Sequence, residues 1–214
     1  MSFTVIDPRD VRDLAPDVLS SNGIPRVMPA AYYKKTSLYE RAVFGNRQGL
    51  YGFPTTELVD WLRVAIGGRT AIEIGAGHGV LAEALCIPAT DSKLQDDPEI
   101  AALYSGMGQS VVTYGNNVEK LEAEQAVTMY RPDVVIASWV THMYLESRHG
   151  AGGNMFGVME ENIISACQSY IFIGNRKVHA QKSIWALPHR IIEPDWLFSR
   201  ASNGSPDFIA VWGA

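Results

Sequence analysis

The chain contains the stretch Thr70-Ala-Ile-Glu-Ile-Gly-Ala-Gly-His-Gly79, and this stretch decides the expected fold. It begins as a short apolar run typical of a buried strand and then places glycine at every other position. The amphipathic segment Val80-Leu-Ala-Glu-Ala-Leu85 follows and predicts a helix. A strand that enters a tight glycine turn and opens a helix presents bare backbone N–H groups to a nucleotide-like ligand. We therefore expect a ligand site at this turn. A glycine turn that only packs the strand against the helix is the alternative.

Strands and helices alternate along most of the chain. Apolar runs predict strands at residues 71–74, 87–90, 111–114, 133–138 and 170–174. Helical patterns are found at residues 55–66, where Gly67-Gly68 ends the helix, and at residues 98–106, 119–129 and 162–167. Near-continuous apolar strands that are separated by helices imply a parallel sheet covered on both faces. The expected fold is therefore α/β, with a doubly wound and mainly parallel sheet.

The two ends of the chain differ from this pattern. Residues 196–200 and 208–212 flank a turn-rich segment that contains Asn203-Gly204, which predicts a C-terminal antiparallel hairpin. The hairpin is expected to supply the only antiparallel strand of the sheet. Residues 1–54 lack clear periodicity but contain several aromatic side chains, so we expect an extension or cap that packs on a core of residues 55–214.

Composition narrows the class of protein. The 214 residues and 47% hydrophobic content fit one domain with a full core. A net charge of -5 argues against a broad nucleic-acid-binding surface. The isolated Cys86 and Cys167 are interpreted as buried, reduced thiols. No apolar run is long enough to span a membrane and the N-terminus does not read as a signal peptide, so we expect a soluble cytoplasmic protein with no membrane partner. The oligomeric state is left open.

Glu73 stands two residues before the first glycine, so the motif reads E-x-G-x-G-x-G. This order resembles the first motif of class I S-adenosyl-L-methionine (SAM) dependent methyltransferases. A dinucleotide-binding fingerprint, G-x-G-x-x-G, would need glycine where Val80 stands. The helix, the five β/α units and the terminal hairpin resemble the whole class I architecture over residues 55–214. The resemblance implies a Rossmann-like domain that binds SAM and transfers its methyl group to an acceptor, either a small molecule or a protein.

The resemblance also implies which residues bind SAM. The turn residues Gly75, Ala76, Gly77 and Gly79 are expected to lie along the methionine moiety and the ribose. Glu73 is expected to accept a hydrogen bond from the ammonium group of SAM.

Two later strand ends supply further candidates. Asp91 follows the second predicted strand and is expected to accept hydrogen bonds from both ribose hydroxyls, although it also suits the N-cap of the next turn. Asn117 and Val118 follow the third predicted strand and match the position where the family contacts the adenine amine and ring. A plain asparagine-rich turn is the alternative there.

The fourth predicted strand leads into Ala137-Ser-Trp-Val-Thr-His-Met-Tyr144. Amino-group methyltransferases often carry [DN]-P-P-[YF] at this position, and this chain does not. Ser138 and Trp139 are expected to contact SAM or the substrate. His142 and Tyr144 are the nearest candidates for a catalytic base, and a surface or capping histidine is the alternative. The glycine-rich residues 148–157 predict either a lid or an ordinary flexible connection.

Other functions stay open. The histidines and cysteines show no metal-binding spacing, so we expect no metal site. An NAD-binding Rossmann enzyme is one alternative to the methyltransferase. A non-catalytic SAM-binding regulatory module is another, because the usual fourth-strand motif is missing and only 11 residues separate Gly79 from Asp91.

Overall fold

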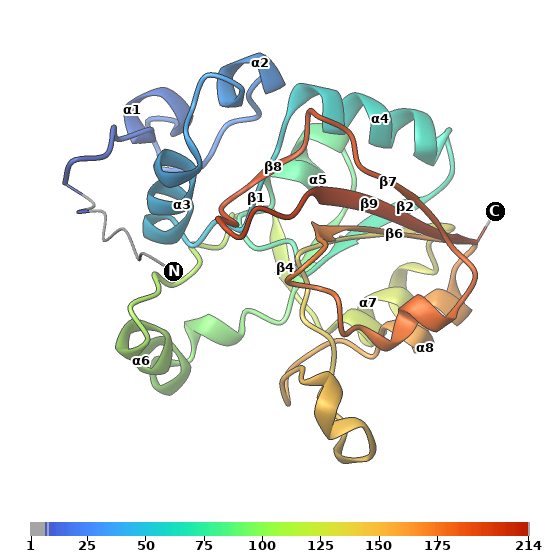
Figure 1. Cartoon of the computed structure of the whole chain (residues 1–214). Coiled ribbons are helices and arrows are strands. Elements are labelled where there is room, and N and C mark those ends of the chain that lie inside the picture. The colour runs from blue at the N-terminus through green and yellow to red at the C-terminus, as the bar shows by residue number, and fades with distance from the viewer. Residues whose placement is uncertain (1–6, 8, 214) are drawn as a thin grey trace.

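The computed structural model describes residue 7 and residues 9–213, and its centre is a seven-stranded sheet (Figure 1). Across the sheet the strand order is β4-β3-β2-β5-β6-β9-β7. The bounds are β2 Ala71–Ile74, β3 Ala89–Asp91, β4 Val118–Lys120, β5 Val134–Ser138, β6 Ser169–Asn175, β7 Arg190–Ile192 and β9 Asp207–Gly213. Strands β2 to β6 pair in parallel, and β9 runs antiparallel to both β6 and β7. The predicted mainly parallel sheet is confirmed. Its chain order reverses between β2 and β5, where ligands bind in open α/β sheets.

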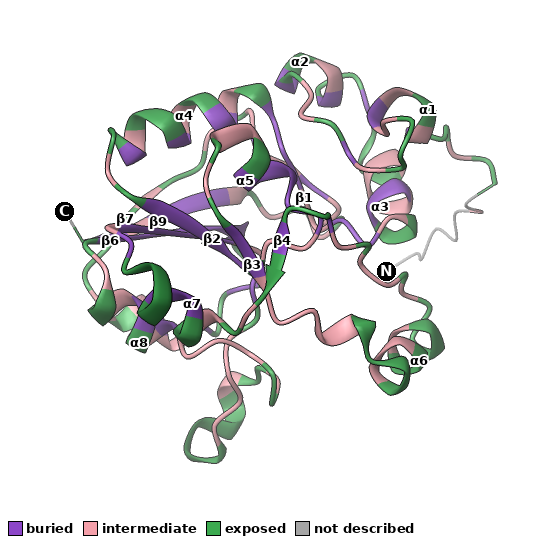
Figure 2. Ribbon diagram, turned by 180° about the vertical axis from the view of Figure 1, so that it is seen from behind, coloured by how far each residue is buried: buried purple, intermediate pink, exposed green. Residues whose placement is uncertain are grey.

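Helices cover both faces of this sheet, as a doubly wound fold requires (Figures 1 and 2). Helices α4 (Thr56–Ile66) and α5 (Val80–Leu85) pack on one face through Leu58, Leu62 and Leu81. Helices α7 (Ala123–Tyr130) and α8 (Glu160–Ala166) cover the other face. Because both faces are covered, all seven positions of β6 are buried.

Local sequence signals explain two of the helices. Helix α4 begins where the Thr55 hydroxyl accepts a hydrogen bond from Leu58 N (3.1 Å) and ends at the left-handed Gly67. Helix α6 (Pro98–Gly106) occupies its predicted bounds, since Asp97 caps it and proline opens it. Together with the short 3-10 helix η1 (Leu94–Asp96), α6 stands away from the sheet, and none of its residues is buried (Figure 2).

The third strand was predicted in the wrong place. Residues 111–114 form no strand, although their sequence favours one, and β4 begins only at Val118. Val112 N instead donates to the Gln95 side chain (2.8 Å) within the excursion that carries α6. Pairing with β3 decides the position, since Val118 lies opposite Ala89. The shift also moves the following helix to residues 123–130.

The two strands of the predicted C-terminal hairpin do not pair with each other. Strand β8 (Phe198–Ser199) pairs with β1 (Gly52–Phe53) in a separate two-stranded sheet, and β9 pairs with β6 and β7. The Asn203-Gly204 turn therefore connects two sheets, and the Asn203 side chain is hydrogen-bonded to Asn175 (2.9 Å). Among the described strands of the seven-stranded sheet, β9 is the only one that runs opposite to the others, as predicted.

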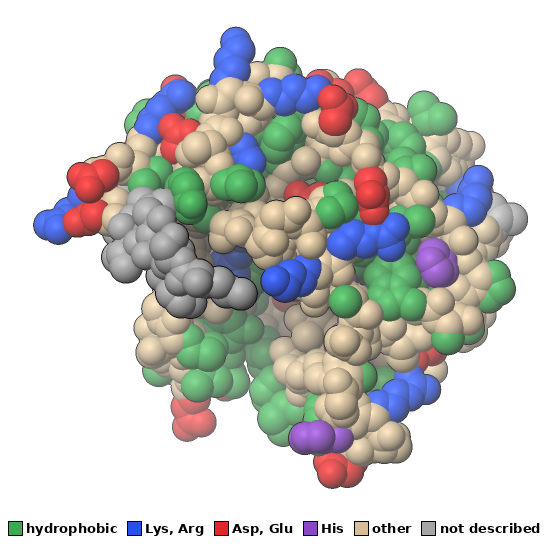
Figure 3. Space-filling model, in the orientation of Figure 1, with side chains coloured by type: hydrophobic (Ala, Val, Ile, Leu, Met, Phe, Trp, Pro, Cys, Tyr) green, Lys and Arg blue, Asp and Glu red, His purple; other side chains and the backbone are tan. Residues whose placement is uncertain are grey.

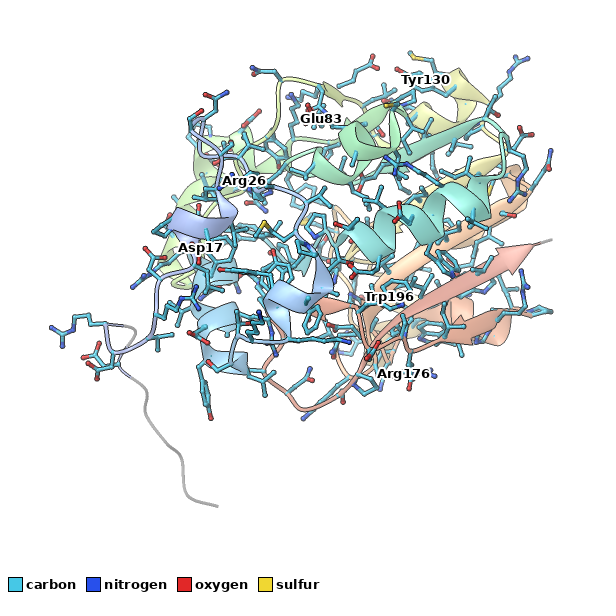
Figure 4. All side chains as sticks on the ribbon, turned by 90° about the horizontal axis from the view of Figure 1, so that it is seen from above. Asp17, Arg26, Glu83, Tyr130, Arg176 and Trp196 are labelled. Atoms are coloured by element: carbon cyan, nitrogen blue, oxygen red, sulfur yellow. The ribbon has the colours of Figure 1, made fainter. Side chains whose placement is uncertain are left out.

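The N-terminal segment lies beside the carboxyl edge of the sheet (Figure 1). Its helices are α1 (Ala15–Val18), α2 (Ala30–Tyr33) and α3 (Leu38–Arg47). They enclose an apolar cluster of their own: Leu14, Val18, Tyr33, Phe44, Leu50 and Phe53. Figure 4, seen from above, shows Asp17 and Arg26 at the outer side of this segment, where Arg26 Nη2 donates to Asp17 O (2.9 Å). The boundary at residue 54 stays an interpretation.

The expectation of buried cysteines is wrong for Cys86, and Cys167 is half-buried. Both cysteines are free, but Cys86 is exposed rather than buried because it caps the end of α5 in a left-handed conformation. Within residues 7 and 9–213, no helix is long and apolar enough to cross a membrane.

The remaining 3-10 helices are η2 (Glu146–Ala151) and η3 (Ser183–Ala186).

Candidate ligand-binding cleft

A cleft of about 250 Å³ lies at the carboxyl ends of the parallel strands. The segments at the ends of β2, β3, β4 and β5 line it, at residues 75–78, 91–92, 94–95, 121–123 and 138–141. Residues 49–54 of the N-terminal segment line it from the other side. In the orientation of Figure 1, the surface is hollowed between the lobe with α6 and the lobe with residues 146–157 (Figure 3). Tyr104 and Phe156 bring these two lobes to the cleft.

The glycine turn leaves space for a ligand at one position in particular. Gly75 and Gly77 both have left-handed backbones, with φ of +60° and +52°. A Cβ atom at Gly75 would lie 2.5 Å from the Val140 side chain, so that glycine is required by packing. A Cβ atom at Gly77 would meet only Val112, at 3.5 Å, although this residue lines the cleft. Gly77 therefore faces open cleft space.

Glu73 is a buried acid beneath this turn. Glu73 lines the cleft, and its carboxylate accepts a hydrogen bond from Ala82 N in α5 (2.9 Å). Burial raises the pKa of Glu73 to about 8. A carboxylate at this position gains from a cationic ligand, because a nearby positive charge offsets the cost of burying the negative one.

Asp91 joins the glycine turn to β3. Its two carboxylate oxygens accept hydrogen bonds from Gly77 N and Lys93 N, both at 2.9 Å. Burial raises the pKa of Asp91. Asp91 thus has the turn-forming role that was the alternative interpretation and also lines the cleft. Each oxygen accepts only one of these bonds, so the carboxylate retains capacity for a ligand's hydroxyls.

The expected adenine contacts lie outside the cleft lining. Asn117 donates from its amide to Gly79 O (3.0 Å) and so braces the turn, while Val118 is buried against Ala82 and Ala89. Gly79 itself does not line the cleft either. The cause is the shifted strand: because β4 begins at Val118, the residues that follow it are 121–123, and these do line the cleft.

Ser138 and Trp139 both line the cleft, as expected for the end of β5. Trp139 has a left-handed backbone with φ of +61°, which is rare for a bulky residue. The ring of Trp139 lies 5.0 Å from the His179 ring and 6.1 Å from the Tyr51 ring, measured between centroids. Burial lowers the pKa of His179 to about 3, so this histidine supports the indole as a neutral group.

A buried ion pair supports the loop after β5. Lys182 forms an ion pair with Glu160, and neither side chain has any solvent exposure. Lys182 Nζ also donates to Val140 O (2.9 Å), and Tyr170 OH donates to Glu160 (2.7 Å). Sequence reasoning missed this network, since 22 residues separate the two charged partners and no motif marks them.

The two expected catalytic bases do not line the cleft. His142 Nε2 lies 3.1 Å from Ala151 O, and Tyr144 OH donates to Glu146 (2.6 Å). Main-chain bridges between residues 142–143 and residues 154–158 fold the loop back on itself, which directs these two side chains elsewhere. The position of neither side chain supports a role at the reacting atoms. Asn154 and Phe156 of the glycine-rich loop do line the cleft, and its closure as a lid stays a prediction.

Two cleft residues were not anticipated. His78 lies inside the glycine motif and is buried, which lowers its pKa. Asp207 is the first residue of β9 and reaches the same edge because that strand runs antiparallel. Only the pairing of β9 with β6 indicates this position. Over the described part of the chain, no three His, Cys, Asp or Glu side chains are grouped as a metal site.

Comparisons with known proteins concern the fold. No family model matches the chain, and no curated protein matches its sequence. Among solved structures, a SAM-dependent O-methyltransferase from Thermotoga maritima is 11% identical, with a TM-score of 0.42 over 83% of this chain and 72% of that one. Precorrin-6y C5,15-methyltransferase from Geobacter metallireducens is 14% identical, with a TM-score of 0.39 over 75% and 89%. A tRNA (uracil-54, C5)-methyltransferase from Pyrococcus abyssi, in complex with S-adenosyl-L-homocysteine, is 12% identical, with a TM-score of 0.38 over 72% and 37%.

Proposed function

We propose that this chain is a SAM-dependent methyltransferase that binds SAM across the carboxyl ends of β2, β3 and β4. The observation that carries the proposal is the open turn at Gly77, which lies in one cleft with the buried Glu73 and the half-buried Asp91. These acids suit the two ends of SAM that offer hydrogen-bond donors, the ammonium group and the ribose.

Different residues of the cleft would bind the ribose, the ammonium group and the adenine ring of SAM. Asp91 would accept hydrogen bonds from the ribose hydroxyls, and Glu73 would balance the ammonium group. The adenine ring would lie against residues 121–123, with Glu122 as acceptor for its amine. When bound, SAM supplies an electrophilic methyl group, so the protein has to orient an acceptor and exclude water. Trp139 and Ser138, which line the cleft at the end of β5, would contact the acceptor. The acceptor itself is a small molecule or a protein.

A non-catalytic SAM-binding module is the second candidate. The observation that favours it is the position of His142 and Tyr144, neither of which lines the cleft. The NAD-binding alternative has less support, since Val80 stands where a dinucleotide fingerprint needs glycine and is buried in α5.

Calorimetry with three ligands tests the proposal: SAM, S-adenosyl-L-homocysteine and NAD. We expect the first two to bind and NAD not to bind. Gly77→Val should abolish binding of SAM and S-adenosyl-L-homocysteine, because the valine side chain would fill the space that the ligand needs.

Gly68→Val is the matched control. Gly68 also has a left-handed backbone, with φ of +81°, and has no atom within 4 Å of an added Cβ. Both variants place valine at a left-handed backbone position, which costs about 1–2 kcal/mol each, so the main difference between them is the position in the cleft. Equal affinity of the two variants for S-adenosyl-L-homocysteine would place the site elsewhere. Binding without transfer to any acceptor pool would favour the module.

A further inference from the structure

The strand order divides the cleft into two parts, and this division rests on the proposed function. The donor part lies over β2, β3 and β4 and would be filled by SAM. The acceptor part lies over β5, β6 and β9, and its lining includes Tyr51, Trp139, Phe198 and Asp207. The chemistry of the acceptor part therefore indicates which molecule receives the methyl group.

The charge of the cleft excludes an anionic acceptor. The described lining residues include four acids and neither lysine nor arginine. The acids are Glu73, Asp91, Glu122 and Asp207. A phosphate or carboxylate group of an acceptor that entered the acceptor part would lose hydration near Asp207 without gaining a lysine or arginine partner from the lining. The acceptor that fits is neutral or cationic.

Two guanidinium groups lie over aromatic rings that belong to the cleft lining. Arg41 lies over the Phe198 ring at 5.3 Å and donates to Thr36 O. Arg200 lies over the Tyr51 ring at 3.7 Å and donates to Gln109 (3.3 Å). Neither arginine lines the cleft, and no ion pair among the described residues joins either one to Asp207. Burial raises the pKa of Asp207, and the charge of Arg41 acts on this pKa in the opposite direction. Asp207 itself lines the cleft, where a ligand can reach it.

Asp207 is held in one orientation by its neighbours. Its Oδ1 accepts hydrogen bonds from Asn175 Nδ2 and Ser199 Oγ, both at 2.9 Å. Asn175 is fixed in turn, because its Oδ1 accepts from Asn203 Nδ2 (2.9 Å) and its Nδ2 also donates to Ser205 O. No described residue donates a hydrogen bond to Asp207 Oδ2. The carboxylate is thus oriented through one oxygen and free at the other.

Aromatic side chains line the same cleft as this acid. Tyr51, Trp139, Phe156 and Phe198 all line the cleft, and the Tyr51 and Trp139 rings lie 6.1 Å apart. Aromatic faces favour both apolar bodies and cationic groups. A single carboxylate among aromatic rings is a setting that suits an amino group carried on an apolar body.

We propose that Asp207 binds the amino nitrogen of the methyl acceptor, and that the protein methylates a small primary or secondary amine with an apolar body. In the reaction the bound ammonium first loses one proton to water, and the unprotonated nitrogen then uses its lone pair to bond the methyl carbon. The carbon–sulfur bond of SAM breaks as this bond forms, and its electron pair stays on sulfur, which becomes a neutral thioether. The nitrogen then loses a proton to the Asp207 carboxylate, which passes it to water.

Binding measurements test this inference without relying on turnover. The full chain is saturated with S-adenosyl-L-homocysteine and titrated with 2-phenylethylamine, 2-phenylethanol and 3-phenylpropanoate. We expect the amine to bind about tenfold more tightly than the alcohol, as for a charge-assisted hydrogen bond, and the acid not to bind. Asp207→Asn should remove the preference for the amine, while Asp195→Asn, at an exposed acid outside the cleft, should keep it. Equal binding of amine and alcohol, no binding of the amine, or an unchanged preference in Asp207→Asn would each overturn the inference.

Two further measurements separate the possible failures. Asp207→Asn should bind S-adenosyl-L-homocysteine as the parent does, because Asp207 lies outside the donor part. If the parent chain itself does not bind S-adenosyl-L-homocysteine, the proposed function is refuted instead. Ser199→Ala removes one hydrogen bond to Asp207 Oδ1 and is the milder variant if Asp207→Asn does not fold. It should weaken amine binding severalfold, and an unchanged amine affinity in Ser199→Ala would also count against the inference.

Discussion

The donor part and the acceptor part of the cleft are built in different ways. In the donor part, residues 71–91 form two strands, the glycine turn and one helix, and they supply backbone N–H groups and the acids Glu73 and Asp91. In the acceptor part, Tyr51, Trp139 and Asp207 come from segments far apart in the chain. A site made of local backbone can be recognised in a sequence, whereas a site made of side chains from distant segments exists only after folding.

The supports of the two parts differ in the same way. Asn117 stabilises the glycine turn through one hydrogen bond, which its side-chain amide donates to Gly79 O. The loop after β5 depends on a fully buried ion pair between Lys182 and Glu160. Removing one partner of such a pair leaves an uncompensated charge, so the acceptor part should be the more fragile.

Breaking the ion pair should have the largest effect. We expect Lys182→Met to lower the free energy of unfolding by about 3–5 kcal/mol, because Glu160 is then buried without a counter-charge. Urea denaturation measures this effect. The double variant Lys182→Met/Glu160→Gln should recover part of the loss, since no net charge stays buried. A loss below about 1 kcal/mol in the single variant would mean that the pair does not support the acceptor part.

Changing Asp91 tests the donor part directly. Asp91→Asn should weaken binding of S-adenosyl-L-homocysteine by about 10- to 100-fold, because an amide accepts hydrogen bonds from ribose hydroxyls less strongly than a carboxylate does. Calorimetry checks this, with Asp96→Asn as the control at an exposed acid nearby. If both variants bind alike, Asp91 serves only as the cap of its turn.

The buried Glu73 predicts how stability depends on pH. Its pKa is raised in the folded chain to about 8 from an ordinary value of 4.5, so between these values the folded chain holds a proton that the unfolded chain releases. The free energy of unfolding should therefore fall as pH rises through this window, by up to about 1.4 kcal/mol per pH unit. Glu73→Gln should remove this slope, as followed by urea denaturation at several pH values. Parallel curves for the two proteins would show that Glu73 is ionised in the folded chain.

The smallest effect is expected at Asn117. Asn117→Ala removes the hydrogen bond to Gly79 O and should cost about 1 kcal/mol of stability. Affinity for S-adenosyl-L-homocysteine should fall only a few-fold, since Asn117 does not line the cleft. Thermal unfolding and calorimetry separate these two quantities. A large loss of affinity at unchanged stability would return Asn117 to the adenine contact that its sequence position predicts.

The fold was predictable where local pattern and tertiary pairing agree. The apolar runs that became β2, β5 and β6 are buried on both faces, so their hydrophobicity alone identified them. The pattern failed at residues 111–114, whose β-forming side chains pack in the α6 excursion, and β4 formed at Val118 instead. That one shift moved the expected adenine contacts out of the cleft.

The amino-acid sequence by itself determined the glycine turn, the acids at its two ends and the α/β alternation, because each depends on residues close together in the chain. Only the tertiary structure decided the acceptor part. It directed His142 and Tyr144 away from the cleft, buried Lys182 against Glu160, and brought Asp207 to the carboxyl edge through an antiparallel strand. Long-range strand pairing and charge burial fix these positions, and neither leaves a local pattern that a single sequence displays.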